Sequence, residues 1–145
     1  MVHKYFRLNG ISHDSSSLVL QANVWIQEGQ KEYLVDLANL ILAWFNKEET
    51  IELRTSGTTG PPKTIYLQKK AMIASAKATG SFFKKAEGTQ ALLCMSTKFV
   101  GGKLMLIRAL TLGWHLDVVE PTARPMVGSD AKYDFVAMVA MNVER

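Results

Sequence analysis

Apolar residues recur every three to four positions between Lys31 and Phe45, in the segment KEYLVDLANLILAWF. This spacing places them on one side of a helix, which the sequence predicts to end near Asn46. A second helix is predicted over Lys69–Lys85, where small residues allow close packing against a neighbour. Before these helices the pattern favours short strands and turns, with Ser17–Trp25 (SLVLQANVW) as the best strand candidate. The expected apolar faces are Leu34, Leu37, Ala38, Ile41, Leu42 and Phe45 in the first helix, and Ile73, Ala76, Gly80 and Phe83 in the second.

Two β-branched segments surround a glycine-rich loop in the middle of the chain. TIELRT (residues 50–55) and TIYL (residues 64–67) are each typical of a strand, so the loop is expected to lie in a hairpin. Farther along, a strand at 90–96 and a strand at 114–121 flank a helix at 103–112, with Gly101 and Gly102 before it and Gly113 after it. This order is a βαβ unit with a right-handed crossover, which predicts the α/β class and a parallel sheet.

The length of 145 residues predicts a single domain. Lead-in strands and a helix are expected over 1–50, the hairpin over 51–67, and the start of an α/β core over 68–145. A polar connection at 121–132 leads to a new apolar segment from Tyr133, and the sequence stops as that element begins. We therefore expect a truncated domain.

Hydrophobic residues make up 48% of the chain and charged residues 21%, a balance that excludes a disordered protein. The net charge of +4 is a mild basic excess, and the paired lysines are typical of a solvated face. Cys94 is the single cysteine and lies in an apolar run, so a buried inert thiol is expected. His3, His13 and His115 lack metal-ligand spacing, so no metal site is expected. Without a secretory pattern or a long apolar stretch, we expect a cytoplasmic protein with no membrane span.

The loop TSGTTGPPK has the chemistry of a polyphosphate cradle. Gly57 and Gly60 can turn successive backbone amides toward one centre, and Lys63 adds a compact positive charge. It is not the Walker pattern, because Pro62 stands where that pattern has its second glycine. A solvated hairpin loop is the alternative reading. Four hydroxyl groups surround the same point, those of Thr55, Ser56, Thr58 and Thr59.

Residues 55–63 resemble the phosphate-binding signature T-S-G-S/T-T-G-x-P-K of the adenylate-forming superfamily, which includes acyl-CoA synthetases, peptide adenylation domains and luciferases. The match to the signature is complete. The segments ALLCMSTKFVGGKLMLIRALTLGWHLDVVEP and DFVAMVAMNVE are similar to the regions that follow it in the family, so the resemblance covers 51–145. The segments TSGTTGPPKTI and STKFVGGK are most similar to those of short bacterial o-succinylbenzoate–CoA ligases of menaquinone biosynthesis.

This resemblance implies a parallel or mixed sheet with flanking helices, as part of the large N-terminal domain of such an enzyme. It implies a ligase that uses ATP, Mg²⁺ and coenzyme A to convert a small-molecule carboxylate first into an acyl-adenylate and then into a thioester. The family's adenine motif, ribose aspartate and catalytic lysine lie downstream, so no catalytic residue is expected here and the fragment alone is expected to be inactive. The implied phosphate-binding residues are Thr55, Ser56, Gly57, Thr58, Thr59, Gly60 and Lys63.

The sequence departs from the family at four positions near these motifs: Thr64 replaces a glycine, Lys69 a histidine, Ser96 a proline and Phe99 a histidine. The resemblance places Lys98, Phe99, Gly101 and Gly102 beside the acyl substrate. Lys98 is read either as a partner for a substrate carboxylate or as a solvated loop lysine, and the two glycines either as a close approach for substrate or as a helix start.

Two other functions stay open. One is an adenylate-forming enzyme for a different acid, such as a phenylacetate-like or fatty substrate. The other is a basic module that binds a polyanion, for which Phe82 and Phe83 beside Lys84 and Lys85 are the nearest approach to interleaved aromatic and basic residues. The ligase reading predicts no nucleic-acid partner, and it leaves oligomerisation possible through surface uncovered by truncation.

Overall fold

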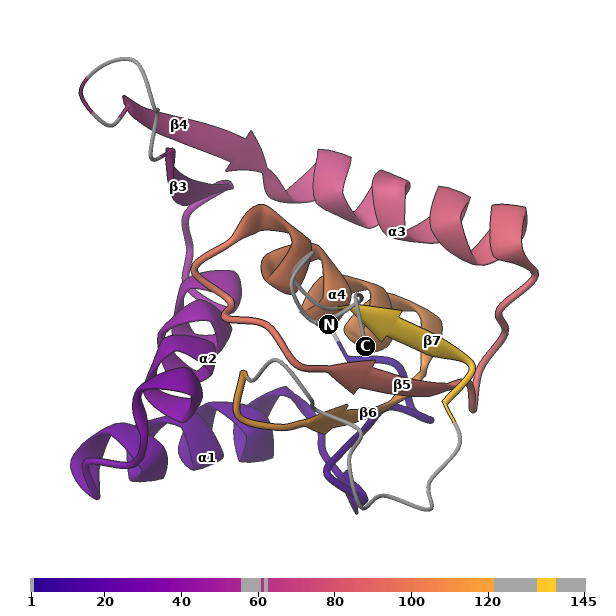
Figure 1. Cartoon of the computed structure of the whole chain (residues 1–145), viewed down its shortest axis with the longest axis horizontal. Coiled ribbons are helices and arrows are strands. Elements are labelled where there is room, and N and C mark those ends of the chain that lie inside the picture. The colour runs from indigo at the N-terminus through magenta and orange to yellow at the C-terminus, as the bar shows by residue number, and fades with distance from the viewer. Residues whose placement is uncertain (1, 56–60, 62, 122–132, 138–145) are drawn as a thin grey trace.

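A computed structural model describes residues 2–55, 61, 63–121 and 133–137 of the chain (Figure 1). Its larger sheet has five strands in the order β2-β1-β6-β5-β7. Strands β1 and β2 pair antiparallel, whereas the β1–β6, β6–β5 and β5–β7 pairs are parallel. The sheet is therefore mixed and mainly parallel, which confirms the predicted α/β class. The strands are β1 (Arg7–Leu8), β2 (Ile11–Ser12), β5 (Gln90–Leu93), β6 (His115–Val118) and β7 (Phe135–Ala137).

The predicted βαβ unit is present as β5, α4 (Val100–Leu112) and β6. Gly113 ends the helix with a φ of 76°, a left-handed conformation that suits glycine. The helix begins at Val100 rather than at Lys103, because the extended backbone of Phe99 caps it and the Phe99 carbonyl accepts the Lys103 amide at 3.0 Å. Gly101 and Gly102 therefore lie inside the first turn of α4.

The predicted strand at 17–25 is wrong, because these residues belong to helix α1 (Ser15–Gln27). Asp14 and Ser17 form a reciprocal cap: the Asp14 carboxylate accepts the Ser17 amide at 2.8 Å, and the Ser17 hydroxyl accepts the Asp14 amide at 3.1 Å. Leu18 and Ala22, four residues apart, supply the buried side of the helix, which packs against α2. The cap and this packing outweigh the local strand preference of Leu18–Leu20.

The two predicted helices are confirmed as α2 (Glu32–Trp44) and α3 (Lys69–Phe83). Helix α3 ends two residues earlier than expected, because Lys84 adopts a left-handed conformation with a φ of 55°. Phe83, predicted on its apolar side, is 50% exposed. Ala76 and Gly80 are buried as predicted, together with Met72, and Ile73 is partly buried against the core.

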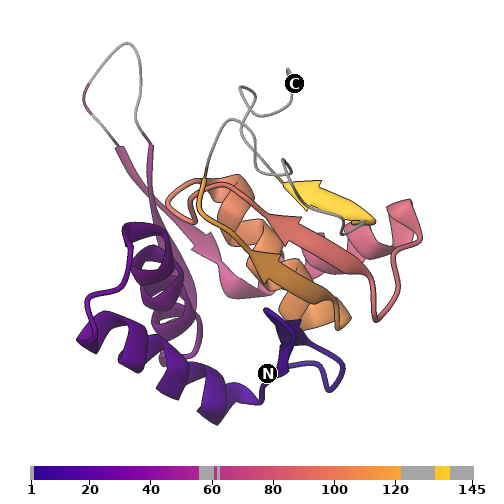
Figure 2. The ribbon, with the colours of Figure 1, turned by 60° about the horizontal axis from the view of Figure 1, so that its bottom comes forward.

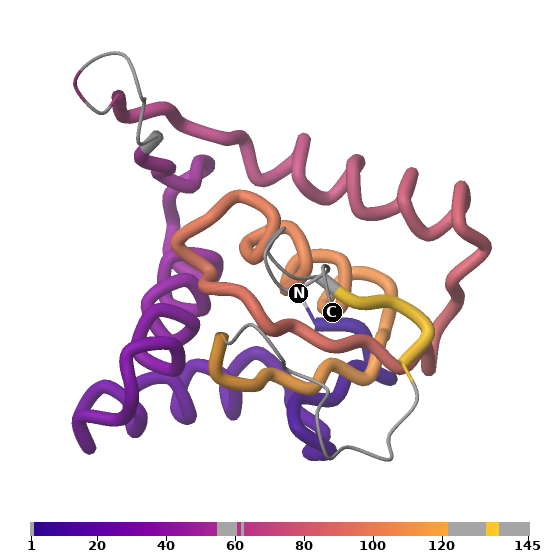
Figure 3. Tube along the Cα trace, viewed as in Figure 1, coloured from indigo at the N-terminus to yellow at the C-terminus, as the bar shows by residue number. Residues whose placement is uncertain are grey.

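Helix α4 packs on β5, β6 and β7, and α3 packs on α4 (Figure 2). Figure 3 follows the chain from α2 into a two-stranded sheet and then along α3, which runs beside α4. The core joins these layers through Phe6, Leu18, Leu37, Ile41, Leu93, Met105, Leu106 and Trp114, all fully buried. Within the described residues, no helix combines the length and apolar character needed to cross a membrane.

Candidate functional site

The glycine-rich loop is held in an antiparallel hairpin, as predicted. Strand β3 (Thr50–Thr55) pairs with β4 (Lys63–Gln68) through six successive residue pairs, from Thr50 opposite Gln68 to Thr55 opposite Lys63. The last pair therefore brackets the loop and fixes the separation of its two ends. Ser56, Gly57, Thr58, Thr59 and Gly60, predicted to bind phosphate, lie outside the described residues.

The hairpin is anchored along one side only. Ile51 and Leu53 of β3 are buried, whereas Glu52 and Arg54, which alternate with them, are exposed. On β4, Ile65 is 40% exposed and Tyr66 63% exposed, so the strand is covered mainly near its end, where Leu67 packs on the core. A backbone hydrogen bond from Lys69 to Glu49, at 2.9 Å, closes the base. The end bearing Thr55 and Lys63 consequently points away from the body of the protein (Figure 2).

Lys63 is exposed at the first position of β4, with its Cα opposite that of Thr55. This is the position from which a lysine can reach an anion held at the open end of the hairpin. The structure thus brings together two of the predicted phosphate-binding residues, Thr55 and Lys63, at the open end of the hairpin.

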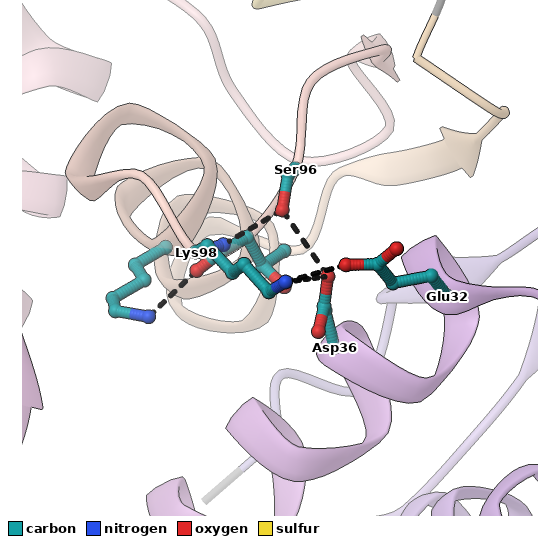
Figure 4. A network of polar contacts seen from close by, with 6 residues as sticks. Glu32, Asp36, Ser96 and Lys98 are labelled. Atoms are coloured by element: carbon teal, nitrogen blue, oxygen red, sulfur yellow. Dashed lines mark hydrogen bonds and ion pairs between the residues drawn. The ribbon is translucent and has the colours of Figure 1, made fainter.

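A second group of predicted residues lies in the loop between β5 and α4 (Figure 4). The Lys98 ammonium pairs with the Glu32 carboxylate and lies 3.9 Å from the Asp36 carboxylate, both on α2. The Ser96 hydroxyl accepts the Lys98 amide at 3.0 Å and donates to Asp36 at 3.3 Å. Lys98 is therefore not a lone solvated lysine, and a substrate carboxylate at this position would compete with two protein carboxylates.

These contacts shift the ionisation of the loop in consistent directions. The hydrogen bond from Lys98 lowers the pKa of Glu32, and the same bond, helped by the charge of Asp36, raises the pKa of Lys98. Burial lowers the pKa of Lys103, whose ammonium donates to the Thr97 carbonyl at 2.6 Å, and the charge of Asp36 opposes that effect. Because both members of the Glu32–Lys98 pair are exposed, solvent screens this pair strongly.

The two predicted glycines have different surroundings. A Cβ on Gly102 would overlap the Ser96 carbonyl oxygen and come within 3.0 Å of Thr97 Cα, whereas a Cβ on Gly101 would meet only the end of the Met95 side chain, at 3.3 Å. Gly102 thus permits α4 to approach its own preceding loop, an account that needs no substrate. Phe99 caps α4 with its side chain 52% exposed.

A pocket of about 230 Å³ joins the base of the hairpin to this loop. Ile51 and Glu52 of β3, Asp36 of α2, and Thr97 and Lys98 of the loop are among its lining residues. The Thr97 hydroxyl is buried without a hydrogen-bond partner among the described residues. The pocket places Lys98 near the base of the hairpin, whereas Phe99, Gly101 and Gly102, also predicted beside the acyl substrate, do not line it.

Sequence reasoning missed Glu32 and Asp36, which organise the loop. Their spacing of four residues places both carboxylates on one side of α2, and this signal was available in the sequence. The sequence did not indicate that Lys98 is the lysine they contact, because Lys98 lies more than sixty residues away along the chain. Across the described part of the chain, no group of three or more His, Cys, Asp or Glu side chains is arranged to hold a metal ion.

Comparisons with known proteins place this fold. A solved structure of an acyl-CoA synthetase (AMP-forming)/AMP-acid ligase II-like protein from Dyadobacter fermentans matches with a TM-score of 0.70 and 37% sequence identity over 81% of this chain. The match covers 35% of that protein, so the chain spans about a third of its length. No protein-family model matches, and neither does any curated protein sequence. The chain has the fold of part of an adenylate-forming enzyme domain, as predicted.

Two structures of o-succinylbenzoate CoA synthetase from Bacillus subtilis are more distant. One, bound to a product analogue, has a TM-score of 0.45 and 21% identity, covering 49% of this chain and 15% of that one. The other, with the acyl-adenylate intermediate, has a TM-score of 0.46 and 14% identity, covering 76% and 35%. Neither bears on the substrate of this chain.

Proposed function

We propose that this chain contributes the phosphate-binding hairpin of an AMP-forming acid–CoA ligase. The observation that carries the proposal is the six-pair hairpin, whose strands flank a complete nine-residue signature that runs from Thr55 to Lys63. The 37% identity to the Dyadobacter fermentans protein supports the general class of adenylate-forming ligase.

In this proposal the hairpin acts by positioning and by charge. Paired strands fix both ends of the loop before ATP binds, so less conformational entropy is lost on binding. Lys63 and the donors of residues 55–60 hold the β- and γ-phosphates of ATP while the acid's carboxylate attacks the α-phosphorus and pyrophosphate leaves. The thiol of coenzyme A then displaces AMP. Mg²⁺ enters with the nucleotide, since phosphate oxygens are its usual ligands and the described residues offer no cluster of their own.

As the acid we propose o-succinylbenzoate, a dicarboxylate. The proposal is supported by the likeness of residues 55–65 and 96–103 to the ligases for that acid, and by a lysine, Lys98, in the loop that lines the pocket at the base of the hairpin. The carboxylate that is not activated would replace Glu32 beside Lys98.

The phosphate proposal is tested by two-dimensional NMR titration of the chain with tripolyphosphate, ATP with Mg²⁺, and AMP. Saturable shifts confined to the amides of 55–63 are expected with the first two ligands and not with AMP, which lacks the β- and γ-phosphates. Lys63→Met should weaken tripolyphosphate binding about tenfold, whereas Lys70→Met, an equal charge change on exposed α3 surface, should leave it unchanged. Equal weakening by both variants would show that only net charge matters.

A polyanion-binding module makes the opposite prediction. Phe82 is 79% exposed and Phe83 50% exposed beside Lys84, so a single-stranded RNA would shift signals at the end of α3. A salt-dependent response there, with none at 55–63, would reject the ligase proposal in favour of the module.

A further inference from the structure

A second pocket, of about 430 Å³, opens where the end of α2, one face of α3 and the last turn of α4 meet. Trp44, Ile73 and Leu110 give it apolar walls, and Lys69, Lys77 and His3 contribute its nitrogen atoms. None of the described residues that line it is acidic. Its volume is within the usual range for small-molecule sites.

The two lysines stand on one face of α3. Lys69, Ile73 and Lys77 follow one another at intervals of four residues, so an apolar side chain separates two ammonium groups whose Cα atoms are about 12 Å apart along the helix. Such an arrangement suits a molecule with an apolar body and an anionic group.

Lys69 is held in place by the protein. Its ammonium donates to the Asn46 side chain at 2.9 Å and to the Asn46 carbonyl at 3.3 Å, and it lies 5.9 Å from the centre of the Trp44 ring. An ammonium has three hydrogens, so one donor remains. Burial lowers the pKa of Lys69, and the charge of Glu48, outside the pocket lining, opposes that shift.

Lys77 is the less engaged cation. It is exposed, and among the described residues it takes part in no hydrogen bond or ion pair. Both ring nitrogens of His3 already have partners: its Nδ1 accepts the Tyr5 amide at 3.1 Å, and its Nε2 lies 3.5 Å from the Glu87 carboxylate. The anion selectivity of the pocket therefore rests on the two lysines.

We propose that this pocket binds a small anionic amphiphile, a carboxylate or sulfonate with an aromatic or branched apolar body. The body would lie against Trp44, Ile73 and Leu110, and the anion would take the donors of Lys77 and Lys69. This site is independent of the proposed ATP site, since Lys69 follows the end of β4 opposite to Lys63.

The test compares 2-naphthoate with 2-naphthamide, a neutral molecule of nearly the same shape, by NMR titration of the full chain. Saturable shifts of the Ile73 and Leu110 methyl groups are expected with naphthoate, and binding of the amide is expected to be at least about fivefold weaker. Lys77→Met should bring naphthoate down to the affinity of the amide, Lys77→Arg should restore it, and Lys70→Met, on the same helix but outside the lining, should have no effect.

Thermal unfolding of each variant shows whether a lost response reflects lost structure. The Lys77→Arg variant separates loss of charge from loss of structure, because it retains the charge. Equal affinity for naphthoate and naphthamide overturns the proposal, as does equal weakening by Lys70→Met. Shifts confined to Phe82 and Phe83, or no saturable shift at Ile73 and Leu110, overturn it as well. Tripolyphosphate binding at 55–63 is an independent reading, so failure here leaves the proposed function standing.

Discussion

Substitution of Gly102 by alanine tests whether α4 must approach its preceding loop as closely as the structure shows. The added Cβ would overlap the Ser96 carbonyl oxygen and lie 3.0 Å from the Ser96 carbonyl carbon and from Thr97 Cα. Ordinary carbon–carbon contacts are about 3.5–4.0 Å, so backbone atoms have to move by roughly half an ångström or more. The obstacle is main chain, and no side-chain rotation relieves it.

The cost follows from two opposing effects. Overpacking of this kind costs about 1–3 kcal/mol, while replacing glycine by alanine in a helix gains up to about 1 kcal/mol and less in a first turn. We expect Gly102→Ala to lower the free energy of unfolding by about 1–2 kcal/mol. With a urea slope of about 1–3 kcal/mol/M, the midpoint should fall by roughly 1 M.

Gly101 provides the matched control, because it lies in the same turn and its Cβ would meet only the end of the Met95 side chain, at 3.3–3.4 Å. Since a methionine terminus can move aside, Gly101→Ala should change stability by less than about 0.5 kcal/mol. Urea unfolding followed by circular dichroism measures both variants. If Gly102→Ala is as stable as the parent, or if both alanines cost the same, the close approach is not what requires glycine.

Three further substitutions or conditions have defined outcomes. Lys84→Gly should stabilise the chain by about 0.5–1 kcal/mol in thermal or urea unfolding, because Lys84 holds a left-handed φ of 55° that glycine adopts without strain; a loss would contradict this. Asp14→Ala should destabilise α1 at neutral pH. The Ser17 amide lowers the folded-state pKa of Asp14, so the cap stabilises above the unfolded value near 4 and is lost as pH falls through the folded value; urea midpoints of the two proteins should therefore converge in acid. Burial raises the pKa of Cys94 to about 11, so iodoacetamide at pH 9 should alkylate the native thiol about fifty times more slowly than the urea-unfolded one, and equal rates would refute its burial.

The elements predicted correctly are those whose periodicity and packing agree. Helix α2 has an apolar face at regular helical spacing. In the βαβ unit, Gly113 ends α4 and adopts the left-handed conformation that its position predicts. The hairpin was predictable because β-branched strands flank a loop rich in glycine. In each case a local signal and the tertiary contacts favour the same structure.

The errors occur where local and tertiary signals differ. Residues 17–25 contain a short apolar run, but a cap at Asp14 and burial of Leu18 and Ala22 against α2 decide for a helix. The exposure of Phe83 could not be predicted from its spacing either. Phe83 falls at helical spacing with Ala76 and Gly80, yet it is half exposed because the chain leaves the helix at Lys84. Spacing alone does not say where a packed face ends.

The network around Lys98 makes one further prediction, because its two carboxylates differ in how firmly they are held. The Glu32 side chain is 76% exposed and bonds only to Lys98 among the described residues, whereas the Asp36 side chain is 14% exposed and also accepts the Ser96 hydroxyl. An acid arriving at Lys98 therefore displaces Glu32 more readily than Asp36, and the loop keeps its place through Ser96.

Glu32→Gln should consequently tighten binding of o-succinylbenzoate, by removing a competing negative charge while leaving the loop in place. Asp36→Asn also removes a charge, but it weakens the contact that positions Ser96, so it should disturb the amide signals of 96–99 before any ligand is added. NMR titration of both variants with the acid separates the two roles. Tighter binding in Glu32→Gln, lost again on adding Lys98→Met, would locate the acid at this lysine; no change in Glu32→Gln would mean that the acid binds elsewhere and that Lys98 serves only to tie the loop to α2.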